Sequence, residues 1–114
     1  MNEKEAKAKI SIYERKLADI LEIQISNEVK YREIKEKEIP LENKVSCLSE
    51  RAELGEISSS QAELAKQELN ELKGTLKKIA ILLKGLKSEE PQYIKRISTG
   101  RKRIVDFDRR KNRI

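Results

Sequence analysis

The sequence predicts an all-α fold, an antiparallel two-helix coiled-coil hairpin with kinks near Pro40 and Pro91. Charged residues make up 40% of the 114 residues and aromatic residues only 4%, too few to fill a conventional globular core. Ala, Glu, Lys, Leu and Arg dominate the composition, which is typical of coiled coils and long helices. Two stretches also carry apolar residues in alternating steps of three and four, and a short segment containing Gly and Ser separates them.

The first predicted helical arm covers about residues 3–54. From Ala6 to Ala52 the steps of three and four pass through fourteen positions, eleven of them apolar, and the register never slips. A heptad pattern sustained over this length predicts a coiled coil rather than an ordinary amphipathic helix. Asn27 occupies one of these positions and is interpreted as a polar layer that sets the register. Because proline removes a helical hydrogen bond, we expect a break at residues 38–40.

A turn is predicted at about residues 55–60, within the sequence ELGEISSSQ. Gly55 is a residue typical of helix ends, and the serines at 58–60 are suitable N-caps for the next helix. Glu63 lies three residues after Ser60, so these two residues are predicted to form a capping box.

The second predicted arm covers about residues 61–111. Sixteen positions from Ala62 to Ile114 continue the steps of three and four, and thirteen of them are apolar. Pro91 predicts a second break, at residues 88–91, and Gly74 and Gly85 weaken the helix by about 1 kcal/mol each relative to Ala. We therefore expect kinked helices rather than straight rods.

The two arms are expected to pair in a single domain covering residues 1–114. A turn near residue 57 brings together positions whose numbers sum to 113 or 114, so Gln24 meets Glu90, and the large Tyr13 and Phe107 face the small Gly100 and Ala6. The two heptad stripes, the positions from Ala6 to Ala52 and from Ala62 to Ile114, are equal in length within about two turns. This match and the short turn favour pairing within one chain, a monomer, although pairing between two chains would use the same positions. The predicted seam comprises Ile10, Tyr13, Leu17, Ile20, Tyr31, Ile34, Leu41, Val45, Leu48, Leu69, Leu72, Leu76, Ile79, Leu83, Leu86, Tyr93, Ile97, Ile104 and Phe107.

The sequence contains no pattern that indicates an enzyme. It has no His, no Gly-rich phosphate loop and no HExxH or GxSxG motif, so we predict no catalytic, metal-binding or cofactor-binding residues and no small-molecule ligand. The single cysteine, Cys47, has no histidine to act as its base. Neither a membrane-length apolar run nor an apolar leader is visible, and one cysteine suits a reducing compartment, so we expect a cytoplasmic location.

Positive charge is concentrated at one end of the predicted hairpin. The segment from Lys95 to Ile114 has nine basic residues and only Asp106 and Asp108 as acids, a net charge of +7. Such an end predicts an acidic partner: nucleic acid, a membrane surface or an acidic socket in a protein. Because Ile97, Ile104 and Phe107 continue the seam through this segment, it does not resemble the basic fork of a leucine-zipper DNA reader. The membrane is disfavoured because the narrow apolar stripe is already used by the seam.

The layout, together with the turn and second-helix entry LGEISSSQAELAKQELNEL, resembles the central stalk proteins of bacterial type III export machines, the FliJ, YscO and SpaM type. The resemblance implies a stalk at the inner-membrane secretion apparatus, with a hexameric secretion ATPase, an export-gate membrane protein and secretion chaperones as partners. By position, it assigns Leu54, Gly55, Ile57 and Gln61 to the gate. It assigns these residues to the ATPase: Lys4, Lys7, Arg15, Arg96, Arg101, Lys102, Arg103, Arg109, Arg110, Lys111 and Arg113. A nucleic-acid-binding coiled coil that uses the basic C-terminal segment is the alternative, and a generic scaffold or substrate chaperone is the third candidate.

Overall fold

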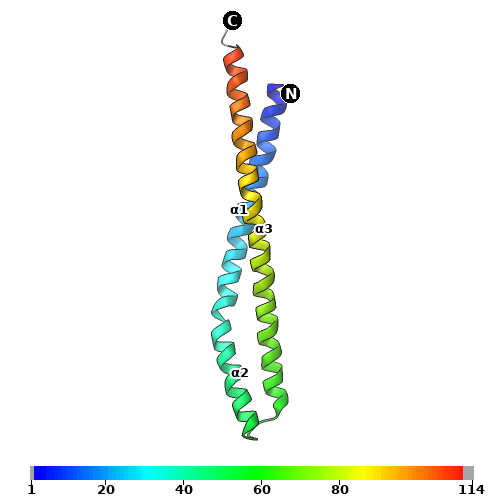
Figure 1. Cartoon of the computed structure of the whole chain (residues 1–114), viewed down its shortest axis with the longest axis vertical. Coiled ribbons are helices and arrows are strands. Elements are labelled where there is room, and N and C mark those ends of the chain that lie inside the picture. The colour runs from blue at the N-terminus through cyan, green and yellow to red at the C-terminus, as the bar shows by residue number, and fades with distance from the viewer. Residues whose placement is uncertain (1, 112–114) are drawn as a thin grey trace. The chain divides into compact units, whose positions relative to one another are not determined.

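Three helices account for nearly all of the residues that the structure describes. The computed structural model describes residues 2–111, is 94% helical and has no strand within that range. The helices are α1 (Glu3–Glu36), α2 (Glu38–Glu53) and α3 (Ser59–Lys111), as labelled in Figure 1. The all-α class predicted from the sequence is therefore confirmed, and the helical structure is compatible with a coiled coil.

The chain divides into two compact units. Unit 1 combines Met1–Ile25 with Lys84–Ile114, and unit 2 is the continuous segment Ser26–Leu83. In unit 1 the first part of α1 packs on the last part of α3, and in unit 2 the rest of α1 and α2 pack on the first part of α3.

The only interruption between α1 and α2 is Lys37, in unit 2. A helical residue 40 would donate its N–H to the carbonyl of Glu36, and proline has no N–H, so α1 ends at that residue. Pro40 then lies in the first turn of α2, where a missing N–H is tolerated. An ion pair of 3.2 Å between Lys35 Nζ and Glu38 Oε2 spans the interruption. The hydrogen bond and the charge of the Glu38 carboxylate raise the pKa of Lys35.

The end of α2 is closed by a glycine in the left-handed conformation. Gly55 has φ +75°, and its N–H donates to the carbonyl of Ala52 at 3.1 Å, while the N–H of Glu56 donates to the carbonyl of Arg51 at 3.0 Å. These two bonds define a Schellman motif. The side chains of Arg51 and Glu56 add an ion pair of 3.2 Å, in the place where this motif more often has an apolar contact.

The N-terminus of α3 lies two residues earlier than the sequence predicted. Ser58, rather than Ser60, is the cap, because its Oγ accepts the N–H of Ser60 at 3.3 Å and its carbonyl accepts the N–H of Gln61 at 3.2 Å. The predicted capping box of Ser60 with Glu63 is therefore wrong, since residue 60 is already inside the helix. Three consecutive serines offer equivalent caps, and the backbone of the turn selects the first.

The second predicted break is absent, because α3 continues through Pro91. A proline here leaves the carbonyl of Lys87 without its usual helical donor. The neighbouring turns are nevertheless held against α1, since Glu90 bonds Gln24 and Tyr93 packs on Tyr13. Packing on both sides of the proline thus keeps the segment helical.

Burial follows the two heptad stripes. Every stripe position whose side chain is described, from Ala6 to Ala52 and from Ala62 to Phe107, is buried or half-buried. Beyond the stripes, four described residues are half-buried: Glu3, Glu42, Ser49 and Ile57. No large side chain in residues 2–110 is fully enclosed, because a seam of two helices covers each side chain from one side only. Ile114 and the side chain of Lys111 lie outside the described part.

Candidate functional site

A polar layer lies in the seam of unit 1. Gln24 is 7% exposed, and its Nε2 donates to Glu90 Oε2 at 3.3 Å, as the numerical pairing of the two stripes predicted. A buried amide is stabilised only while its hydrogen-bonding groups have partners. The pair therefore favours one register of α1 against α3 over its neighbours.

A second predicted layer, Tyr13 opposite Gly100, is wrong in detail. The rings of Tyr13 and Tyr93 lie 6.2 Å apart at 49°, and Arg96 Cζ lies 5.6 and 5.5 Å from their centroids. The residue facing Gly100 is Ile10, whose Cγ1 would be 2.6 Å from a Cβ built on that glycine. A layer count treats each side chain as a point, whereas a phenol ring reaches past the opposite residue to other rings and to a guanidinium that attracts it.

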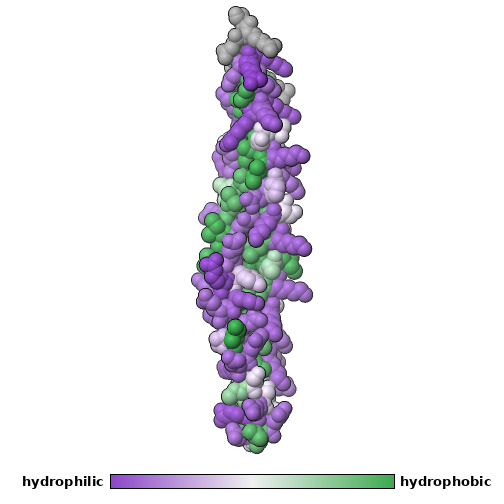
Figure 2. Space-filling model, turned by 60° about the vertical axis from the view of Figure 1, so that its left-hand side comes forward, coloured by the Kyte–Doolittle hydropathy of each residue, from purple (hydrophilic) through white to green (hydrophobic). Residues whose placement is uncertain are grey.

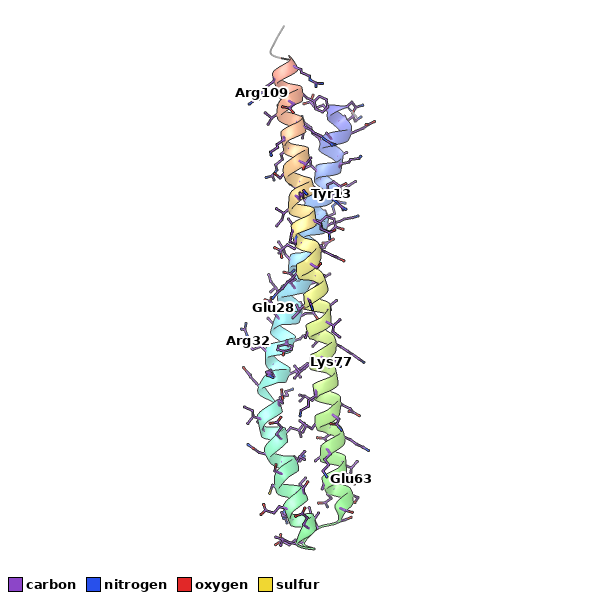
Figure 3. The ribbon with its side chains drawn as sticks, in the orientation of Figure 1. Tyr13, Glu28, Arg32, Glu63, Lys77 and Arg109 are labelled. Carbon is purple, nitrogen blue, oxygen red and sulfur yellow. The ribbon has the colours of Figure 1, made fainter. Side chains whose placement is uncertain are left out.

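The basic C-terminal segment is part of a folded element. Ile97 is buried and Ile104 and Phe107 are half-buried, while the basic residues between them and beyond are exposed, as far as residue 110. Figure 3 labels Arg109 near the end of α3 and Tyr13 on α1. The cationic side chains are thus fixed on the outer faces of a helix whose inner face packs on α1.

The residues assigned to the ATPase differ in how they are bound. Lys7 pairs with Glu3 at 3.2 Å, Arg101 pairs with Glu14 at 3.0 Å, and Arg96 lies over the two tyrosine rings. Arg103 also has an interaction within the protein. Arg113 and the side chain of Lys111 lie outside the described residues. The following are exposed and form no ion pair within residues 2–110: Lys4, Arg15, Lys102, Arg109 and Arg110.

Charge differs between the two units. Unit 1 has sixteen basic and nine acidic residues, and unit 2 has ten basic and eleven acidic residues. The excess positive charge of the protein is therefore confined to unit 1. An acidic partner would be attracted to this unit and not to unit 2.

An open groove between α1 and α3 of unit 1 was missed by the sequence reasoning. It has a volume of about 770 Å³, its apolar lining includes Leu17, Leu21, Ile94 and Val105, and its basic lining consists of Arg101, Lys102 and Arg109. Figure 2 shows apolar patches, in green, among the hydrophilic side chains of the surface. The signal in the sequence was the second set of apolar residues flanking the stripe, at Leu21, Ile94 and Val105.

The residues assigned to the export gate surround the turn of unit 2. Leu54 is 69% exposed, Gly55 and Gln61 are also exposed, and Ile57 is half-buried. Their local geometry is fixed by the Schellman motif and by the Ser58 cap. The turn thus presents an apolar side chain, Leu54, on a well-defined backbone.

None of the described helices is long and apolar enough to cross a membrane. Within the described residues, no three His, Cys, Asp or Glu side chains lie together as metal ligands would. Comparison of the chain with known protein families, curated proteins and solved structures gives no match.

Proposed function

We propose that the protein is the non-enzymatic central stalk of a type III protein export apparatus. Unit 1 enters a hexameric secretion ATPase, and the turn around Leu54–Gln61 faces the export gate. The supporting observation is that the basic side chains stand on the outside of a packed two-helix unit rather than on a loose tail. A folded basic plug suits an acidic socket, because the helical backbone that carries its charges is ordered before binding and loses little conformational entropy.

In this proposal the two arms pair within one monomeric chain as an antiparallel hairpin. The contact of Gln24 with Glu90 and that of Glu14 with Arg101 support this direction, because residue numbers rise along one helix as they fall along the other. The proposal also includes kinks in the helices near Pro40 and Pro91, because each proline removes one helical hydrogen bond. Secretion chaperones are further candidate partners.

The stalk proposal is tested by reversing charge on unit 1. The variant carries five substitutions: Arg101→Glu, Lys102→Glu, Arg103→Glu, Arg109→Glu and Arg110→Glu. It should no longer bind the purified secretion ATPase of the same organism and should no longer stimulate ATP hydrolysis by that enzyme. Circular dichroism verifies that the variant is still helical. Binding and stimulation equal to those of the wild type would refute the proposal.

A matched control places the same number of reversals on unit 2. The exposed residues Lys30, Lys44, Lys66, Lys77 and Lys78 form no ion pair within the described part of the chain, and Figure 3 labels Lys77 on α3. Reversing them should leave ATPase binding unchanged. Loss of binding in both variants would show that total charge, rather than unit 1, determines the interaction.

The nucleic-acid alternative is separated by its salt dependence. A protein that neutralises several DNA phosphates loses about 10³–10⁵ in affinity between 50 and 200 mM salt. The stalk proposal predicts no measurable affinity for duplex DNA at physiological salt. Tight duplex binding that weakens this steeply, together with no binding to the ATPase, would favour the alternative.

A further inference from the structure

The groove of unit 1 has the dimensions of a seat for one helix. Its lining on α3 extends from Ile94 to Arg109, about 22 Å or four turns at 1.5 Å per residue, and its lining on α1 extends from Glu14 to Leu21. Ile94, Ile97, Ser98, Arg101 and Val105 recur at the spacing of one helix face. A third helix lying along α1 and α3 would meet ridges of matching spacing.

The apolar side chains of this groove are open to solvent. Ile94 is 50% exposed, Val105 48% and Leu21 38%, beside the buried Ile97. Contiguous exposed apolar surface bordered by polar residues is characteristic of interaction sites. The groove is continuous with the seam, since Leu17 and Ile97 belong to both. A docked helix would therefore extend the seam of unit 1 into a three-helix bundle.

The rim of the groove determines which helix would fit. Lys102 and Arg109 both line it and form no ion pair within the described residues, whereas Arg101 is paired with Glu14. Asp106 also lines the groove, and it forms no ion pair with either cation. Lys102 and Arg109 are seven residues apart, so they lie about two turns apart on one side of α3. Carboxylates spaced seven residues apart on a docked helix would meet both.

We propose that the unit 1 groove binds one acidic amphipathic helix of a partner protein, with its apolar face on Ile94, Val105 and Leu21 and its carboxylates on Lys102 and Arg109. The proposal rests on the proposed function in one respect, that unit 1 is the end of the protein that binds partners. A second copy of this chain is a poorer occupant, because two units that each have sixteen basic and nine acidic residues repel one another.

The probe is a synthetic, fluorescently labelled peptide of about 21 residues, three heptads with Leu at the a and d positions and Glu at e and g. Its like charges oppose self-association, so the free probe stays monomeric. Fluorescence anisotropy with the full chain should show saturable binding. A second peptide with the same leucines but Lys at e and g should bind at least about tenfold more weakly, because Lys102 and Arg109 repel its lysines.

Variants of the protein locate the binding. Ile94→Ser and Val105→Ser should each weaken binding of the Glu peptide by about tenfold, as expected for the loss of one apolar anchor from a small interface. Ile12→Ser is the matched control, because Ile12 is 51% exposed in α1 of the same unit and does not line the groove. It should leave the affinity unchanged. All three positions are half-exposed, so circular dichroism should show unchanged helicity.

Each other outcome overturns the proposal. Absence of binding would show that the groove does not bind an acidic helix. Equal binding to Val105→Ser and wild type would show that net charge, rather than the groove, attracts the peptide. A dimer of the free chain in sedimentation, converted to a monomer by Val105→Ser, would identify a second copy as the occupant.

The stalk and groove proposals fail separately. Peptide binding that depends on Val105, without any binding to the secretion ATPase, would support the groove proposal and refute the stalk proposal. ATPase binding that is unaffected by Val105→Ser, together with absent peptide binding, would support the stalk proposal and refute the groove proposal.

Discussion

Replacing Gly100 by Ala tests how closely the two helices of unit 1 approach each other. A Cβ at this position would lie 2.6 Å from Ile10 Cγ1 and 3.0 Å from its Cδ1, and Ile10 is only 8% exposed. The nearer atom belongs to the stiff part of a β-branched side chain, so it moves only with χ1 or the backbone. Overpacking of this kind costs about 1–3 kcal/mol, whereas Ala in a helix interior gains about 1 kcal/mol over Gly. The expected net change is a loss of about 0–2 kcal/mol.

Gly85→Ala is the internal reference for this experiment. Gly85 lies in α3 of the same unit, and a Cβ there meets nothing within 4 Å, so its substitution should stabilise by about 0.5–1 kcal/mol. Urea unfolding followed by circular dichroism measures both. In an Ile10→Ala background the clash is absent, and Gly100→Ala should then stabilise as Gly85→Ala does. Equal stabilisation by Gly100→Ala with Ile10 intact would show that the two helices do not approach each other this closely at Gly100.

Three further substitutions test the seam and the turn by the same unfolding measurement. Glu90→Ala should cost about 1–3 kcal/mol because it leaves the buried Gln24 amide unsatisfied, whereas replacing both residues by Leu should be neutral or stabilising. Gly55→Ala should cost about 1–2 kcal/mol, since φ at this residue is +75°. Ser58→Ala should cost about 0.5–2 kcal/mol through loss of the α3 cap.

Each of these substitutions has a contrary result. A double Leu variant that is less stable than Glu90→Ala would mean that the polar layer is needed for more than its own satisfaction. Equal effects of Gly55→Ala and Gly74→Ala would argue against the left-handed residue in the turn, because Gly74 is helical with open space around it. A larger loss of stability in Ser60→Ala than in Ser58→Ala would indicate that Ser60 is the cap, as the sequence predicted.

The parts of the structure that depend on periodicity could be predicted from the sequence. Steps of three and four fix which residues share a helix face, and the described stripe positions are all buried or half-buried. Gly55 was also recognisable, because only glycine adopts φ +75° without strain. The pairing of Gln24 with Glu90 followed from the position of the turn alone.

Other features depend on the size and direction of side chains, which a count of positions does not contain. Tyr13 bypasses Gly100 because its ring packs with Tyr93 and Arg96, and the smaller side chain of Ile10 takes the space. The continuity of α3 at Pro91 depends on packing at the adjacent turns. The groove required knowing which apolar residues outside the stripe remain uncovered, namely Leu21, Ile94 and Val105.

The one-sided burial in the seam has a thermodynamic consequence. The heat-capacity change of unfolding grows with the apolar area that unfolding exposes, and for globular domains it is about 12–15 cal/mol/K per residue. In this chain no large side chain of residues 2–110 is fully enclosed, and each of the three helices has at least one exposed Ile or Leu side chain. The heat-capacity change per residue should therefore fall below that range. Its stability curve will be shallow, and the protein will change little in stability over a wide span of temperature before it melts gradually.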